Sequence, residues 1–225
     1  MTTAGVRRSA PGAVPAPAAA QGPAWLRLVR LHLVSRRVPA AAALLAGFGA
    51  LLWAGLHWHW NVAGGPAAAI VIPLVTEAGA AAVIAVTSYG PFGEPERATG
   101  RWLPYLRLGT TLALTAAAIG LLALGSAGGE LPGGFAAVAR NVAGITGAGL
   151  LAAATFGGVL AWTGPMAYLV VTETALAGSV TTPWGWPGRP PLDRGGAICA
   201  CLVLAAGLAL VTVRGVRESA RDTTT

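Results

Sequence analysis

The chain has 225 residues, of which 55% are hydrophobic and only 10% are charged, and its mean hydropathy is +0.65. Soluble globular domains carry about 25% charged residues, so this composition excludes an ordinary soluble domain and indicates a protein that lies in a bilayer. The net charge of +7 does not indicate nucleic-acid binding, because the arginines flank apolar runs, where they set orientation and meet anionic lipid.

The amino-terminal part divides into a tail and an amphipathic segment. Residues 1–22 are rich in Pro, Ala and Gly without periodicity, which predicts a disordered tail. From Pro23 onward, apolar and basic residues recur at helical spacing. The apolar residues are Trp25, Leu28, Val29 and Leu33, and the basic ones are Arg27, Arg30, Arg36 and Arg37. We predict a helix parallel to the membrane surface that leads into the first span; the alternative is a basic flank that only sets topology.

Six apolar runs follow, each close to the roughly 20 residues that a helix needs to cross the hydrocarbon core. They cover residues 39–56, 66–88, 104–125, 135–157, 159–179 and 195–213. The fourth and fifth runs are nearly continuous, with a natural break at Trp162-Thr163-Gly164-Pro165; a seven-span or re-entrant path stays open there. The sequence therefore predicts an all-α, polytopic membrane bundle over residues 23–218, followed by a disordered tail at 219–225.

The arginines predict the orientation of this bundle. With six spans and the amino terminus inside, the cytoplasmic side receives twelve arginines: Arg7, Arg8, Arg27, Arg30, Arg36, Arg37, Arg97, Arg101, Arg107, Arg214, Arg217 and Arg221. The outer side receives three: Arg140, Arg189 and Arg194. Tryptophans, which prefer the interfaces, then fall near the outer boundary (Trp53, Trp58, Trp60, Trp184, Trp186) or the inner one (Trp25, Trp102, Trp162). We expect a multi-pass cell-membrane protein with both termini in the cytoplasm.

Two glutamates, Glu77 and Glu173, lie within apolar runs, where an ionisable group is costly unless it is paired or in contact with water. Arg140 and Asn141 lie one turn inside the outer end of the fourth run. Counting about 1.5 Å of rise per residue brings Arg140 within reach of Glu173. We predict that these two pair and that Glu77 lies deeper, unpaired or facing water. The four residues form either a substrate- or proton-handling site or a polar clamp between helices.

The only sizeable polar insertion in the first half of the chain covers residues 88–107. A Gly90-Pro91 break precedes a charged and aromatic segment that contains Glu94, Glu96, Arg97, Arg101 and Trp102. This pattern predicts a short amphipathic segment at the cytoplasmic face, where a partner would make contact. The alternative is a solvated turn whose charges only keep it in the cytoplasm.

Signals for metal, disulfide or enzyme chemistry are weak. His57 and His59 could form a metal pair, but no Asp, Glu or Cys lies nearby, which favours an interfacial aromatic segment. Cys199 and Cys201 are two residues apart and point away from each other, so we expect no disulfide. Phosphate-loop, zinc-helix and nucleophile-elbow motifs do not occur in the sequence. We expect no metal, cofactor or catalytic residues, and any ATP hydrolysis in another chain.

Several local phrases are similar to small actinobacterial ABC-permease-like membrane proteins. They lie at residues 91–97 (PFGEPER), 103–107 (LPYLR), 140–147 (RNVAGITG), 162–168 (WTGPMAY) and 184–190 (WGWPGRP). The order of a basic interfacial helix, two spans, an amphipathic cytoplasmic segment and four further spans resembles the six-span membrane subunits of ABC-2-type transporters. This chain differs from them in its very short outer loop at 126–134.

The resemblance implies an elbow helix at residues 25–37 and a coupling helix at 94–102 that docks on a separate nucleotide-binding ATPase. It also implies a homo- or heterodimer of six-span units. On this expectation the chain is a transporter permease subunit. The alternative is a non-transporting membrane scaffold or regulatory protein whose loop recruits a cytoplasmic partner without ATP use.

Overall fold

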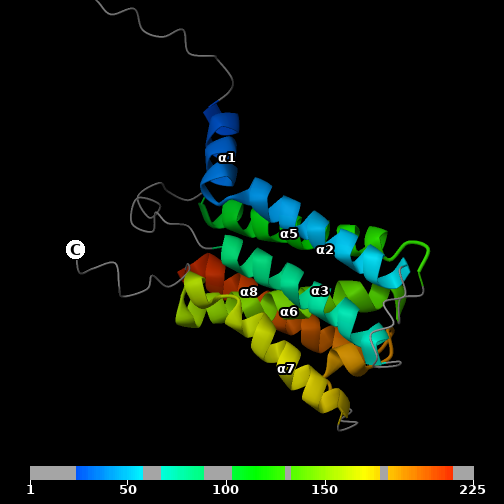
Figure 1. The fold of residues 1–225 in the computed structure, drawn as a ribbon. Helices are drawn as coiled ribbons and strands as arrows, with labels where there is room; N and C mark the ends of the chain where they lie inside the picture. The colour runs from blue at the N-terminus through cyan, green and yellow to red at the C-terminus, as the bar shows by residue number, and fades with distance from the viewer. Residues whose placement is uncertain (1–23, 58–66, 89–102, 130–132, 178–181, 215–225) are drawn as a thin grey trace, which may run out of the picture.

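The computed structural model describes residues 24–57, 67–88, 103–129, 133–177 and 182–214, and within these ranges the chain is helical without strands. The helices are α1 (Ala24–Ser35), α2 (Val38–His57), α3 (Ala67–Thr87), α5 (Leu103–Gly125), α6 (Gly134–Phe156), α7 (Thr163–Ala177) and α8 (Arg194–Arg214), with two 3-10 turns, η1 (Gly158–Leu160) and η2 (Trp186–Gly188). From α2 to α8, successive helices run in alternating directions and form one bundle (Figure 1).

Four of these helices, α2, α5, α6 and α8, are long and apolar enough to cross a membrane. α3 has 21 residues, and α7 has 15. At about 1.5 Å per residue, α7 is roughly 22 Å long, short of the roughly 30 Å hydrocarbon core. The predictions of an all-α fold and of membrane-length helices are confirmed, whereas six complete spans stay a prediction.

The fourth and fifth apolar runs are separate helices, as expected, but the break lies earlier than the predicted one. α6 ends at Phe156, and Gly157 then adopts a φ of 96°, a conformation that glycine reaches without steric cost. η1 and a turn at residues 161–162 lead into α7. Gly164 and Pro165, which we predicted to break the chain, instead lie in the first turn of α7, where proline is tolerated.

α6 is the central helix of the bundle, and it packs against α3, α5, α7 and α8. Small residues on α6 let neighbouring backbones approach closely, which is the usual way that helices pack in membranes. A Cβ atom added at Gly147 would lie 2.5 Å from the backbone nitrogen of Leu204 on α8. A Cβ atom added at Gly164 of α7 would lie 2.5 Å from the carbonyl oxygen of Ala148. The absence of side chains at these glycines therefore allows α7 and α8 to pack directly against α6.

α6 with α7 and α8 forms one half of the bundle. In the other half, α2, α3, α5 and α6 share a hydrophobic core. Its largest fully buried side chains are aliphatic: Leu45, Leu52, Ile84, Leu122 and Val142. Gly49 and Gly125 let the backbones of α2 and α5 touch. Because α3 and α6 contribute to this core and also contact α7, they join the two halves of the bundle.

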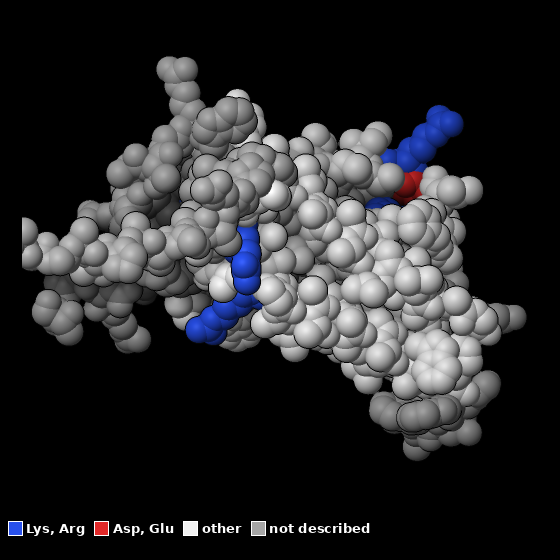
Figure 2. Space-filling view, turned by 90° about the horizontal axis from the view of Figure 1, so that it is seen from above, with Lys and Arg blue, Asp and Glu red and all other residues white. Residues whose placement is uncertain are grey.

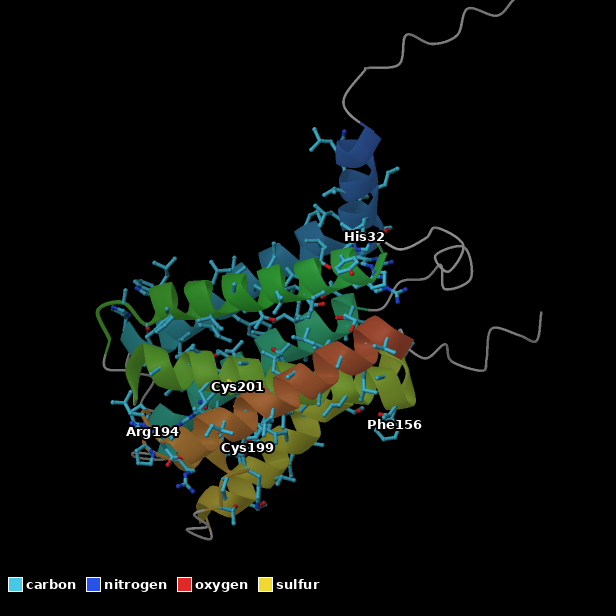
Figure 3. All side chains as sticks on the ribbon, turned by 180° about the vertical axis from the view of Figure 1, so that it is seen from behind. His32, Phe156, Arg194, Cys199 and Cys201 are labelled. Atoms are coloured by element: carbon cyan, nitrogen blue, oxygen red, sulfur yellow. The ribbon has the colours of Figure 1, made fainter. Side chains whose placement is uncertain are left out.

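α1 runs across the direction of the other helices at one end of the bundle (Figure 1). Figure 3 shows that His32 of α1 and Phe156 of α6 lie at this end, whereas Arg194 lies at the opposite end. α1 exposes the apolar side chains Leu31 and Val34 together with Arg30. A helix therefore occupies the predicted interfacial segment, and its contact with a membrane surface stays a prediction.

The two arginines between α1 and α2 have different roles. Arg36 was expected on the cationic, exposed side of the segment, but its side chain is only 4% exposed and donates a hydrogen bond to the carbonyl of Ser88 at the end of α3. The turn into α2 bends the chain over α3, and the unpaired carbonyls at a helix end accept hydrogen bonds from cationic side chains. Arg37 is exposed and adopts a φ of 54°.

Candidate functional site

Glu77 is the most buried of the acidic residues that the structure describes. It occupies the middle of α3, and its residue is only 3% exposed. One turn earlier, Pro73 lacks the backbone N–H that would bond to the carbonyl of residue 69. The hydroxyl of Thr76 donates to the carbonyls of Ile72 and Pro73 at 3.1 and 2.8 Å. Around Glu77 the helix thus has an altered pattern of backbone hydrogen bonds, which the Thr76 hydroxyl supplements.

Asn141 of α6 connects Glu77 to Arg140. The Nδ2 atom of Asn141 donates to Oε2 of Glu77 at 3.0 Å, and Nε of Arg140 lies 3.4 Å from Oδ1 of Asn141. All three residues are buried. A buried amide that both accepts and donates has satisfied polar groups, and it holds its neighbours in fixed positions. The contacts define a polar network between α3 and α6.

The guanidinium of Arg140 extends this network to the loop before α8. Its two terminal nitrogens donate to the carbonyls of Pro190 at 2.8 Å and Arg189 at 3.2 Å. A guanidinium carries five N–H donors in a fixed fork and therefore suits several acceptors at once. Arg140 thus ties the loop to the amino-terminal part of α6.

Aromatic residues hold the same loop in the bundle. Trp186, in η2, is only 2% exposed and stacks on Tyr168 of α7 with 4.5 Å between the ring centroids. The hydroxyl of Tyr168 donates to the carbonyl of Trp184 at 2.7 Å. A Cβ atom added at Gly144 of α6 would lie 2.5 Å from the Trp186 ring, so the indole fits where α6 has no side chain. Gly144 thus leaves space for the Trp186 ring between α6 and α7, and the predicted place of this indole near a membrane boundary stays a prediction.

Asp193 closes the loop at the start of α8. Its carboxylate forms an ion pair with Arg189, with Nε and Oδ2 2.7 Å apart, and accepts a hydrogen bond from the backbone N–H of Gly196. The Arg189 hydrogen bond, followed by the Gly196 N–H, lowers the pKa of Asp193. Asp193 therefore caps α8 and holds Arg189, whose carbonyl Arg140 binds.

The lowered pKa of Asp193 gives a pH-dependent contribution to stability. The carboxylate stabilises the fold fully above the unfolded-state pKa of about 3.9, and the stabilisation is lost as the pH falls through the lower folded-state pKa. We expect the melting temperature of the wild type to exceed that of Asp193→Asn by a constant margin above about pH 5. The margin should shrink between about pH 4 and 2. Thermal unfolding in detergent across this range measures it, and parallel curves down to pH 2 would contradict the assignment.

The predicted pairing of Arg140 with Glu173 was wrong. In the structure Arg140 donates to Asn141 and to the two loop carbonyls. Among the described residues, the buried Oε1 atom of Glu173 has no hydrogen-bond partner. The loop before α8 folds back over α6, so its carbonyls rather than the α7 carboxylate meet the guanidinium. Glu77, which we expected to be unpaired or facing water, bonds to Asn141 instead.

The remaining predicted residues lie partly outside the described ranges. The predicted coupling residues Glu94, Glu96, Arg97, Arg101 and Trp102 lie outside them, as does His59. His57 closes α2, where its Nδ1 atom lies 2.9 Å from the carbonyl oxygen of Trp53 and its ring stacks on that indole. Cys199 and Cys201 are both free thiols on α8 (Figure 3).

Sequence reasoning missed Tyr168, Trp186 and Asp193 as parts of the network around Arg140. Asp193 carried a recognisable signal, because an aspartate directly before an apolar helical run is a typical N-cap. Trp186 stands in a Pro/Gly-rich loop, where the composition does not indicate burial. Tyr168 lies in an apolar run whose inward face cannot be identified without its neighbours.

The structure therefore defines a class: an all-helical bundle with helices of membrane-spanning length and a buried Glu–Asn–Arg network that a folded loop closes at one end. Comparison with protein-family models, with curated proteins and with solved structures found no match.

Within the bundle, the network can act in two ways. It fastens α3, α6 and the loop before α8 to one another, as a polar clamp does. If the loop and Asn141 moved away, the Glu77 carboxyl would be available to a proton or to a polar substrate.

Proposed function

We propose that this chain is the six-span membrane subunit of an ABC-type transporter, located in the cell membrane and working with a separate ATPase chain. The observation that carries the proposal is the hydrogen bond from Arg36 to the carbonyl of Ser88. It links the turn after α1 to Ser88, the first residue of the polar insertion at 88–107, which contains the predicted coupling helix at 94–102. An elbow helix and a coupling segment that share one anchor would move together when an ATPase binds.

The arrangement of charges supports the orientation that the proposal requires. On the face shown in Figure 2, the described charged side chains gather near the two ends of the molecule, and the described surface between them is uncharged. Arg30, Arg36 and Arg37 lie at the α1 end, and Arg189 and Arg194 lie at the opposite end. The positive-inside rule then favours the α1 end as cytoplasmic, with both termini inside.

Cysteine accessibility tests this orientation. In a protein with Cys199 and Cys201 replaced, a single cysteine at Gly188 should react with a membrane-impermeant thiol reagent in intact cells, because Gly188 is exposed at the end opposite α1. Single cysteines at Thr99 and Thr223 should react only after the membrane is permeabilised. Reaction of the Thr99 cysteine in intact cells would reverse the proposed orientation.

The proposed transport function requires coupling to ATP hydrolysis through residues 94–102. We expect the double variant Arg97→Glu/Arg101→Glu to insert normally and to change stability by no more than about 0.5 kcal/mol, because surface substitutions of this kind contribute little. It should nevertheless fail to retain a nucleotide-binding subunit. The measurement is ATP hydrolysis by the complex purified in mild detergent and reconstituted in lipid, with the ATPase chain identified by its phosphate-loop sequence.

Two comparisons make the coupling experiment decisive. Arg194→Glu, at the opposite end of the bundle, is the matched control and should leave the complex and its ATP hydrolysis intact. Full ATPase binding by the Arg97→Glu/Arg101→Glu protein would contradict the coupling role and favour the alternative that residues 94–102 are a solvated turn.

A bound cytoplasmic partner without nucleotide hydrolysis would favour the scaffold function. A native mass equal to two six-span units with two ATPase chains would support the dimer that the proposal implies.

A further inference from the structure

A groove opens on the outside of the bundle between the first turns of α2 and the last turns of α3. Its volume is about 370 Å³. α2 contributes Ala40, Ala41 and Leu44 to its wall, α3 contributes alanine and valine side chains, and Arg37 lies at its end. Ala40 and Ala41 contribute only methyl groups to this wall.

The side chains that line this groove present an apolar surface. Leu44 of α2 and Val86 of α3 expose about half of their surface, 56% and 43%. Thr87, which also lines the groove, donates its hydroxyl to the carbonyls of Val83 at 2.6 Å and Ile84 at 2.9 Å. Its one O–H donor is therefore used within α3, and the remaining α2 and α3 side chains of the groove present hydrocarbon, which suits an apolar occupant.

Arg37 provides the charged end of the groove. It is exposed and is, among the described residues, the only one other than glycine with a positive φ, 54°. Left-handed backbone is unfavourable for arginine and free of this cost for glycine. The backbone alone would therefore favour glycine at this turn, and the arginine side chain needs a separate reason. A cation at the mouth of an apolar groove gives one.

We propose that the groove between α2 and α3 is a binding site for an anionic phospholipid, with an acyl chain along the alanine and valine wall and the phosphate on the Arg37 guanidinium. Leu44 lies two turns beyond Arg37, about 10 Å along the helix, which matches the upper part of an acyl chain below its headgroup. Arginine is suited to phosphate by its planar fork of donors. The site depends on the membrane location of the bundle and not on ATP-driven transport.

Native mass spectrometry of the full-length protein in mild detergent tests the site with phosphatidylglycerol and phosphatidylcholine of identical chains. The wild type should retain phosphatidylglycerol in preference. Arg37→Gly should lower that preference about fivefold, the factor expected for one arginine at an anionic headgroup. It should fold normally, because glycine suits the positive φ. Arg37→Lys keeps the charge and should keep most of the preference.

A second pair of variants tests the groove itself. Ala40→Phe should fill the groove and reduce the binding of both lipids, while Arg37 stays in place. Ala43→Phe adds the same side chain to an exposed α2 position outside the groove and should leave lipid binding unchanged. Wild-type lipid preference in Arg37→Gly, or equal effects of the two phenylalanine variants, would overturn the proposal.

Discussion

Replacing Gly147 by alanine is expected to destabilise the bundle by about 1–3 kcal/mol, the usual cost of adding a group to a close-packed interior. The added methyl would lie 2.5 Å from the backbone nitrogen of Leu204 and 2.6 Å from its Cα atom. Neither atom can rotate away as the end of a flexible side chain could, so α6 and α8 must separate. Because α6 is the central helix of the bundle, the separation would disturb packing on several sides.

The measurement is the thermal stability of the purified protein, followed as loss of the monodisperse peak on size-exclusion chromatography after heating in detergent. Gly120→Ala is the matched control. It adds the same methyl to a helix of the same length, at a position where no atom beyond the local helix backbone lies within 4 Å of the new carbon. Alanine favours a helix over glycine by about 1 kcal/mol, so this variant should be unchanged or slightly more stable. Equal melting temperatures for Gly147→Ala and wild type would show that α6 and α8 are not in backbone contact.

Breaking the contact between Asn141 and Glu77 is the second change with a large expected effect. Asn141→Ala removes the amide that donates to the buried carboxyl at 3.0 Å. A buried polar group left without its partner costs about 1–3 kcal/mol, and a stranded charge costs about 3–5 kcal/mol. We expect Asn141→Ala to fall in this combined range. Adding Glu77→Ala should cost less than the sum of the single changes, because the second variant removes the stranded group.

A double-mutant cycle separates this contact from the pairing that the sequence predicted. Residues in direct contact show coupling energies of about 0.5–3 kcal/mol, and distant residues are additive. The Asn141–Glu77 cycle should show such coupling. Arg140→Ala combined with Glu173→Ala should be additive, because Arg140 bonds to Asn141, Arg189 and Pro190 instead. Coupling between Arg140 and Glu173 would show that the network is arranged differently from the structure.

Much of the helical framework could be predicted from the sequence alone. Runs of about 20 apolar residues must form helices in a bilayer, since an unsatisfied backbone group is too costly there. This requirement is local, so the predicted run at 104–125 falls within α5 and the run at 195–213 within α8. It also explains why Glu77 and Asn141, as polar residues inside apolar runs, could be identified as candidates before their partners were known.

Tertiary structure alone decided which polar groups meet. Helical rise gives the depth of Arg140 in the membrane, but not the rotation of α6 or the path of the loop that brings the carbonyls of Arg189 and Pro190 to its guanidinium. Trp186 is buried because α6 has glycine at residue 144. That is a contact between segments about 40 residues apart, which composition cannot reveal. The length of each apolar run determined where helices form, whereas shape complementarity between segments distant in sequence determined which polar groups are partners.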